Sequence, residues 1–174
     1  MPDLIDLILA RRSVREFLPR PVAPEQLEAV LRAAQAAPSA GNLQSYAIVV
    51  VSSESSRHAL ARAALDQDCV ARASHVLVFL QDPQRASRRY GRRGRELYSL
   101  QDATIACGYA HLAAAALGLG SCWIGAFYPD QVRAMVAAPE ELIPVAMLAL
   151  GHPASRPEDP GRRALSEILH VERF

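Results

Sequence analysis

The longest stretch of the sequence without an Asp, Glu, Lys or Arg side chain runs from Ala103 to Pro129. The pattern predicts one long helix, from about Glu96 to Leu117, that is apolar or small on every side over most of its length. Such a helix has to be covered all round, either by a protein core and a subunit interface or by lipid. Glycines at Gly118–Gly120 interrupt the stretch, and no basic cluster directly flanks its C-terminal end. We therefore expect a long buried helix and no membrane segment.

Shorter helical and extended patterns alternate along the rest of the chain. We expect helices over residues 3–10, 24–36, 52–65 and 130–136, and strands over residues 47–51, 75–80, 121–125 and 143–150. Segment 47–51 is an unbroken apolar run, which predicts a buried strand. Residues 84–95 are rich in Arg, Gly and Ser and are expected to form a loop, and the chain after Gly151 is irregular until about Leu165. Strands separated by helices indicate a mixed α/β or α+β layer fold, with residues 1–174 as a single domain.

Composition and cysteine usage narrow the class of protein. An apolar content of 51% with a formal net charge of +1 is typical of a folded globular protein and shows no overall bias toward nucleic acid. Three scattered cysteines and five histidines without metal-ligand spacing predict neither a disulfide framework nor a metal site. The N-terminal segment carries Asp3 and Asp6 within its apolar run and has no cleavage pattern of a signal peptide. The expected location is therefore the cytoplasm.

Basic side chains gather near both ends of the chain, and all 19 basic residues are arginines. In an extended segment alternate side chains share a face, so Arg11, Ser13 and Arg15 would point the same way. A guanidinium group binds two phosphate oxygens at once and a hydroxyl adds a donor, so the pattern predicts a phosphate site. Read alone, each group also fits a solvated basic turn. The candidate residues are Arg11, Arg12, Ser13 and Arg15 at one end, and Arg162 and Arg163 at the other.

A polar loop between the second predicted helix and the first predicted strand is another candidate for ligand binding. Its hydroxyl and amide groups come from Ser39, Asn42 and Gln44. Each amide side chain offers one acceptor and two donor hydrogens, which suits a flat ligand edge with alternating carbonyl and N–H groups. Alternatively, these side chains stabilise the turn itself.

Glycines surround the third predicted strand, in the stretch GLGSCWIGAF from Gly118 to Phe127. Because glycine lets a backbone approach a planar ring closely, the backbone of Ile124 and Gly125 is a candidate ligand contact. The stretch is not a dinucleotide fingerprint, since no third glycine falls at the required spacing and the helix comes before it. A core strand with a tight lead-in is the alternative, and Cys122 is expected to be a small buried residue there.

The order and spacing of these segments resemble those of the nitroreductase family. The resemblance covers nearly the whole chain and rests on RRSVREF, PSAGNLQ, GRELYSLQDATIA, GLGSCWIGAF, PVAMLALGHP and RRALSEILH. It implies an α+β fold with a mostly antiparallel central sheet flanked by helices, one FMN per active site, and a homodimer with the long helix at its interface. Two departures are visible. Ile124 stands where better-known members have an acidic residue, and Gln44-Ser45-Tyr46 stands where many have Gln-Pro-Trp.

The same resemblance implies roles for the candidate residues. The phosphate of FMN would be held by Arg11 and Ser13, beside Arg12, together with Arg162 and Arg163. Arg15 would face the N1/O2 edge of the flavin. The remaining contacts would come from Ser39, Asn42 and Gln44 of the partner subunit, and from the backbone of Ile124 and Gly125 near flavin N5 and O4.

The implied activity is that of an FMN-dependent NAD(P)H oxidoreductase with a ping-pong cycle. NADH or NADPH would deliver hydride to flavin N5, and a small electron-poor molecule such as a nitroaromatic or a quinone would then accept electrons. One alternative is a flavin-binding or flavin-processing protein of the same fold without NAD(P)H turnover. A more remote one is an Arg-rich nucleic-acid-binding protein, although we expect no nucleic-acid partner. The basic run Arg88–Arg95 fits a rim for NAD(P)H phosphates, a nucleic-acid contact with few interleaved aromatics, or a solvated loop.

Overall fold

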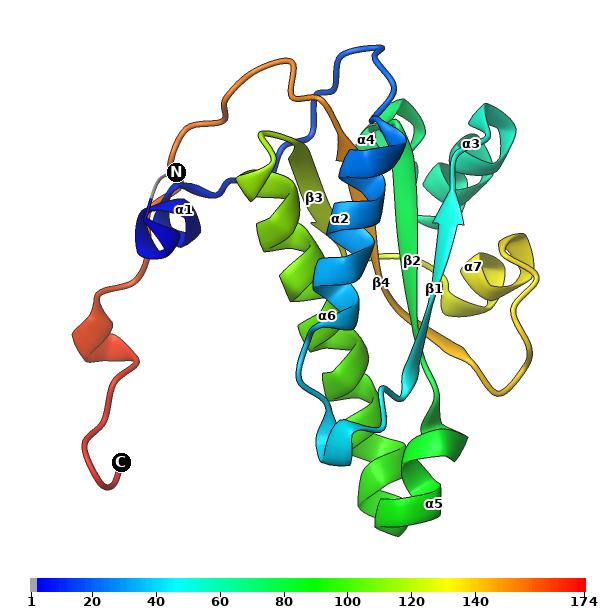
Figure 1. Ribbon diagram of the computed structural model, residues 1–174, viewed down its shortest axis with the longest axis vertical. Coiled ribbons are helices and arrows are strands. Elements are labelled where there is room, and N and C mark those ends of the chain that lie inside the picture. Colours follow the sequence, from blue (N-terminus) through cyan, green and yellow to red (C-terminus); the bar gives the residue numbers. More distant parts are fainter. Residues whose placement is uncertain (1–2) are drawn as a thin grey trace.

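The computed structural model describes residues 3–174 and shows a layered arrangement of helices on an antiparallel sheet (Figure 1). Its four strands are β1 (Tyr46–Val51), β2 (His75–Gln81), β3 (Gly120–Ile124) and β4 (Ile143–Gly151). They lie in the order β1-β2-β4-β3, and every neighbouring pair is antiparallel. The α+β class with an antiparallel central sheet is therefore confirmed.

Seven α-helices connect and cover the strands of the described chain. They are α1 (Leu4–Ala10), α2 (Pro24–Gln35), α3 (Glu54–Ala63), α4 (Asp68–Arg72), α5 (Pro83–Arg93), α6 (Ser99–Ala116) and α7 (Pro129–Met135). Two 3-10 turns, η1 (Ala40–Asn42) and η3 (Leu165–Glu167), and a π-helical turn, η2 (Gly94–Tyr98), complete the helical elements. Helix starts have local causes. Pro24 begins α2, where no intrahelical N–H bond is needed, and the Ser53 hydroxyl accepts a hydrogen bond from the Ser56 N–H at the start of α3.

The core lies on both faces of the sheet because the central strands are apolar on both sides. On β2, alternate side chains divide between two clusters. Leu77 and Phe79 pack with residues of α2 and α6, while Val76, Val78 and Leu80 pack with residues of α3, α4 and α7. Helices α2 and α6 thus cover one face, and α3, α4 and α7 cover the other.

The first strand corrects one expectation from the sequence. Its apolar β-branched run predicted a buried strand, but β1 is an edge strand that pairs only with β2. Its side chains are mostly half-buried, and Val50 is 39% exposed. The run specifies extended backbone, whereas burial depends on which strand lies beside it, and that is a tertiary property.

The arginine-rich stretch corrects a second expectation. Residues 84–95, predicted as a loop, form most of α5 and the start of η2. The Asp82 carboxylate accepts a hydrogen bond from the Arg85 N–H and so caps the helix, and Pro83 occupies its first turn. Arginine is a good helix former. The helix is kinked at Gly91, where φ is 55°, a backbone conformation that glycine adopts without strain. The long helix α6 consequently begins at Ser99, after the π-helical turn. Helix α4 was not predicted.

Helix α6 is buried on one side and carries exposed apolar side chains on the other. Ala106, Ala110 and Ala114 pack against α2 and the sheet. On the opposite side Ile105 is 38% exposed and Tyr109 is 42% exposed. Among residues 3–174, no helix has both the length and the apolar character that a bilayer crossing requires.

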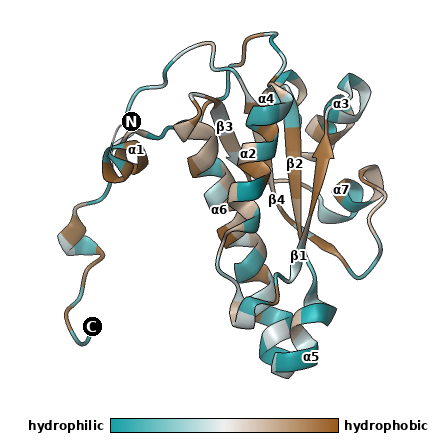
Figure 2. Cartoon of the chain, viewed as in Figure 1, coloured by the Kyte–Doolittle hydropathy of each residue, from teal (hydrophilic) through white to brown (hydrophobic). Residues whose placement is uncertain are grey.

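The two ends of the chain extend away from this core on the same side of the molecule (Figure 1). Helix α1 and the segment that follows β4 carry apolar side chains that the rest of the chain leaves exposed (Figure 2). The most exposed of these side chains are Leu4, Ile5, Leu9, Leu165, Ile168, Leu169, Val171 and Phe174. Several large apolar side chains exposed on these segments are typical of a site for interaction with another molecule or a second copy.

Candidate functional site

The segment that follows α1 is anchored along the free edge of β3 and beside the end of β4. The Val14 N–H donates to the Ser121 carbonyl at 3.0 Å, and Ser13 and Ser121 form a parallel β-bridge. Further on, the Leu18 N–H donates to the His152 carbonyl at 2.9 Å. Val14 turns into the core, so its neighbours Ser13 and Arg15 turn outward, as the alternation in an extended segment requires.

A cavity of about 290 Å³ brings arginines from both ends of the chain together. Positive charge is concentrated here. Burial first, and then the nearby charges of Arg162 and Arg12, lower the pKa of Arg11. Arg12 is paired with Asp159. The residues that line the cavity are Arg11, Arg12, Ser13, Arg15, Pro157, Glu158, Pro160 and Arg162. Four guanidinium groups and a hydroxyl form a donor set that suits a phosphate monoester.

The structure adds a residue that the motif did not reveal. His111 of α6 lies 2.6 Å from Arg11, measured from its Nε2 to Nη1 of the guanidinium, and its Nδ1 lies 2.6 Å from the Ser121 hydroxyl oxygen. The ring is 8% exposed, and burial, followed by the charge of Arg11, lowers its pKa to about 4. The imidazole is therefore neutral near pH 7. Its Nε2 accepts from Arg11, and its Nδ1–H donates to Ser121.

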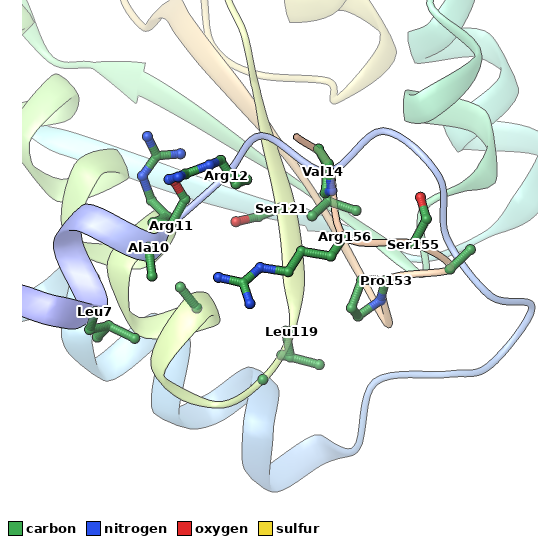
Figure 3. A pocket seen from close by; sticks show the side chains of 14 residues that line it. Leu7, Ala10, Arg11, Arg12, Val14, Leu119, Ser121, Pro153, Ser155 and Arg156 are labelled. Carbon is green, nitrogen blue, oxygen red and sulfur yellow. The ribbon is translucent and has the colours of Figure 1, made fainter. Parts of the chain in front are cut away.

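A larger cavity of about 560 Å³ shares Arg11 and Arg12 and opens between α1, the end of α6 and residues 153–157 (Figure 3). Leu7, Ala10 and Leu119 provide much of its apolar lining. Figure 3 shows the Arg156 side chain extending across this cavity toward Arg11 and Arg12. Arg11 and Arg12 thus line both of two adjoining cavities.

The polar loop that carries Ser39, Asn42 and Gln44, here called the amide loop, is held at the N-terminal end of α6. The Asp102 carboxylate accepts hydrogen bonds from the Ala40 N–H at 2.9 Å and the Ser45 N–H at 3.1 Å. Ser39 accepts from the Gln44 N–H at 3.0 Å, and the Gln44 amide donates to the Asn42 side-chain oxygen at 3.2 Å. The turn interpretation is therefore realised in this structure, since the polar side chains do stabilise the loop.

Ser45 shows what one departure from the family pattern does. A proline in this position could not donate to Asp102, whereas the Ser45 N–H does. The Ser45 hydroxyl is buried and has no hydrogen-bond partner among the described residues.

The basic helix α5 also contacts the loop, because Arg85 donates to the Leu43 carbonyl at 2.5 Å and Arg89 to the Gly41 carbonyl at 3.3 Å. Part of the Arg88–Arg95 region therefore adjoins the amide loop.

The phosphate-type donors and the amide loop are attached to different parts of α6. Asp102 and His111 are nine residues apart in α6, which corresponds to two and a half helical turns and roughly 14 Å along the axis. The extra half turn also places Asp102 and His111 at opposite edges of the buried side of the helix. The loop is attached at one margin and Arg11 at the other.

Besides the three residues of the amide loop, three more of the expected contact residues do not line the cationic cavity. Arg163 is exposed and paired with Glu167 at 3.0 Å, so only Arg162 of that pair lines the cavity. Ile124 ends β3 with its side chain in the core, and Gly125 follows it on the surface. The neighbouring Cys122 is buried, as expected.

A model described as the nitroreductase family matches residues 8–152 of the chain. Among curated proteins, the chain is 30% identical to an "FMN reductase (NADPH)" of Bacillus subtilis over 187 residues, which covers 100% of this chain and 75% of the relative. It is 32% identical to an "NADPH-flavin oxidoreductase" of Vibrio harveyi, with 100% of this chain and 75% of the relative covered.

A solved structure has the same fold. It is an "NADPH:FMN oxidoreductase from Vibrio harveyi complexed with NAD+", which superposes with a TM-score of 0.90 at 31% identity. The superposition covers 98% of this chain and 77% of the other.

Proposed function

The chain belongs to the nitroreductase family, and we propose from that premise that it is an FMN-dependent oxidoreductase that takes hydride from NADH or NADPH and reduces a small electron-poor molecule. The NAD(P)H-dependent flavin chemistry follows from membership of the family and from relatives such as the FMN reductase and the NADPH-flavin oxidoreductase. The electron acceptor, a nitroaromatic, a quinone or a similar compound, and the ping-pong order of the two half-reactions are the further parts of the proposal.

The cationic cavity is the observation that carries the proposal. It collects Arg11, Ser13 and Arg162 from opposite ends of the sequence in one place, and it has the fixed positive charge and hydroxyl donor that a phosphate monoester requires. These residues, with Arg12, would hold the FMN phosphate. Arg163 would join them only by exchanging its ion pair with Glu167 for the phosphate.

A second copy of the chain would complete the site. The loop with Ser39, Asn42 and Gln44 is attached near one end of α6 and Arg11 near the other, which supports the proposal that the two groups of one protomer serve two different FMN molecules. The exposed apolar side of α6 and the apolar residues of both chain ends support a homodimer, since each would be buried by a partner. In the dimer the amide loop of one copy would contact the flavin held by the arginines of the other.

The protein's own residues bind and orient, while the cofactor carries the reaction. When bound, FMN supplies N5 as the hydride-accepting atom and lets the two substrates use one site in turn. Arg15 would stabilise negative charge at the N1/O2 edge of the ring. The exposed backbone at Gly125, with that of Ile124, would approach the opposite edge, where a side chain would obstruct a planar ligand. No side chain is required as a nucleophile.

We also propose that residues 1–174 act as a single FMN-binding domain. Residues 1–2 lie outside the described part of the chain. For the rest, one continuous sheet carries both core clusters, and the family match extends across most of the chain. The residues beyond the match include Arg162, which lines the cationic cavity and so ties the tail to the same site.

An absorbance spectrum of the purified protein tests the proposed function. A flavin spectrum near 450 nm that is bleached by anaerobic NADH or NADPH, and restored by a nitroaromatic or a quinone, is the expected result. A colourless protein that does not bind added FMN would overturn the proposal. A yellow protein that neither nicotinamide bleaches would instead support the flavin-binding alternative without turnover.

A further inference from the structure

Arg11 differs from its neighbour Arg12 in the kind of partner that holds it. Arg12 is paired with the Asp159 carboxylate. Within residues 3–174, no carboxylate lies within ion-pair distance of Arg11, and the side-chain partner of its guanidinium is the His111 ring. A carboxylate would hold the guanidinium but would also offset its charge, whereas a neutral ring holds it and leaves the charge free for an anion.

The His111 ring is itself held in one orientation. Its Nδ1–H donates to the Ser121 hydroxyl at 2.6 Å, which leaves the Nε2 lone pair directed at Arg11. A protonated ring would have no lone pair there and would repel the guanidinium. The hydrogen bonds therefore run in one direction: Arg11 donates to His111, and His111 donates to Ser121.

Ser121 connects these hydrogen bonds to the backbone of the arginine motif, residues 11–15. While its hydroxyl receives the His111 hydrogen bond, its carbonyl accepts from the Val14 N–H at 3.0 Å. One residue of β3 thus fixes both the strand position of the motif and, through His111 on α6, the direction of the Arg11 side chain. Both residues are buried, so the arrangement does not depend on solvent-exposed contacts.

We propose that His111 is a positioning residue for anion binding, which holds Arg11 toward the cationic cavity as a neutral, Ser121-anchored acceptor. The inference rests on the proposed function, because the anion in question is the FMN phosphate. A flexible arginine loses rotamer freedom when it binds an anion, and an arginine that is already oriented loses less. Removal of His111 should therefore weaken binding of the phosphate and leave binding of the ring unchanged.

The test compares FMN with riboflavin, which lacks the phosphate. The full-length chain is freed of flavin, and the Kd of each ligand is measured by fluorescence quenching for the native chain and for His111→Phe, which keeps an aromatic ring but removes both hydrogen bonds. We expect the FMN Kd to rise about five- to tenfold, as the cost of ordering one flexible side chain on binding implies, and the riboflavin Kd to change less than about twofold. Equal losses for both ligands, or an unchanged FMN Kd, would overturn the proposal.

Two further variants keep the test decisive if His111→Phe folds poorly. His111→Gln retains one acceptor and one donor and should recover part of the FMN affinity, whereas Ser121→Ala removes only the anchor of the ring and should reproduce part of the loss. His58→Gln on the exposed surface of α3 is the matched control and should leave both Kd values unchanged.

A double-mutant cycle shows whether His111 acts through Arg11. In an Arg11→Ala background, His111→Phe should cause little additional loss of FMN affinity, because the group that it positions is already gone. Fully additive losses would contradict the positioning role. If the native chain binds neither FMN nor riboflavin, the proposed function fails; if it binds FMN and His111→Phe binds it equally well, only this inference fails.

Discussion

The Asp102 carboxylate in the first turn of α6 accepts a hydrogen bond of 2.9 Å from the Ala40 N–H, which links the long helix to a loop 62 residues earlier in the chain. The second oxygen of the same carboxylate accepts from the Ser45 N–H at 3.1 Å. Asp102 is 2% exposed, so this carboxylate is satisfied by backbone groups and not by water. The loop that carries Ser39, Asn42 and Gln44 is therefore fixed at both of its ends by one side chain.

Substitution Asp102→Asn should destabilise the fold and loosen the loop. An amide places an NH₂ group against one of the two N–H donors, so one buried backbone donor loses its acceptor. We expect the free energy of unfolding to fall by about 2–3 kcal/mol, with faster hydrogen exchange at the Ala40 and Ser45 amides. Urea titration and exchange measurements check this. Asp130→Asn, an exposed first-turn position in α7, is the control and should change stability by less than about 0.5 kcal/mol. An equal effect of both substitutions would contradict the assignment.

Substitution Gly120→Ala should displace the arginine motif from β3. A Cβ at this position would lie 2.8 Å from Val14 Cγ1 and 2.9 Å from Val14 Cβ, which is too close for either atom to remain in place. We expect about 1–3 kcal/mol of destabilisation and weaker FMN binding, measured by thermal unfolding and by flavin titration. In the double variant with Val14→Gly, which removes both Cγ1 and Cβ, the two changes should be less than additive, because the new methyl group then meets neither atom. Additive losses would show that Val14 is not the residue in conflict.

The buried imidazole predicts a loss of stability in mild acid. His111 has a pKa of about 4 in the folded protein and an ordinary value near 6.5 when unfolded. Between these pH values only the unfolded chain takes up the proton, so the free energy of unfolding falls as the pH is lowered from about 6.5 to about 4. The full contribution is on the order of 3 kcal/mol. Urea titrations of the native chain and His111→Gln across this range should show a smaller slope for the variant. Identical slopes would mean that this ring is not held neutral.

His75 should contribute equally to the acid sensitivity of the native chain and of His111→Gln in the urea titrations. Its pKa is also lowered, by burial first and then by Arg57, so part of the acid sensitivity should remain in His111→Gln. The quantity to compare is therefore the difference between the two slopes and not the slope of either protein.

The two neighbouring arginines near the C-terminus should differ in their effect on FMN. Arg162 lines the cationic cavity, whereas Arg163 is engaged with Glu167 outside it. Arg162→Ala should weaken FMN binding roughly tenfold or more, and Arg163→Ala less than about threefold, because only the former removes a charged donor from the cavity. The double variant Arg11→Ala with Arg162→Ala should lose flavin during purification while remaining folded. The flavin content from absorbance at about 450 nm and 280 nm is the measurement. Stoichiometric FMN in the double variant would refute the phosphate-site assignment.

A charge on the exposed side of α6 should prevent assembly. Ile105→Glu places a carboxylate on the apolar surface that a second copy would bury. We expect a monomer by size-exclusion chromatography with light scattering, and loss of bound flavin as the second half of the site is removed. Val50→Glu on the edge strand β1 is the control, since Val50 is equally exposed but lies on another surface. A dimeric Ile105→Glu protein would place the interface elsewhere.

Several elements could be predicted from the sequence because their causes are local. The strands of the sheet follow from apolar runs such as His75–Gln81. Helix α3 follows from its Ser53 cap, and α6 follows from the uncharged stretch that begins at Ala103. The cationic and amide motifs were also visible, since they depend on residue types at short spacings. The error at α5 arose because local signals conflict. In α5 the glycines and arginines suggested a loop, while the Asp82 cap and Pro83 favoured a helix.

The sequence by itself determined most of the helical and extended segments, with α4 and α5 as exceptions, and it determined which side chains could bind a phosphate or a flat polar edge. Backbone propensity and side-chain chemistry are properties of neighbouring residues. Only the tertiary structure decided that β1 lies at the edge of the sheet, that Arg162 joins Arg11 while Arg163 does not, and that Arg11 is oriented by a histidine 100 residues away. These are contacts between distant segments, and they form only when the layers pack. No short-range pattern in the chain specifies them.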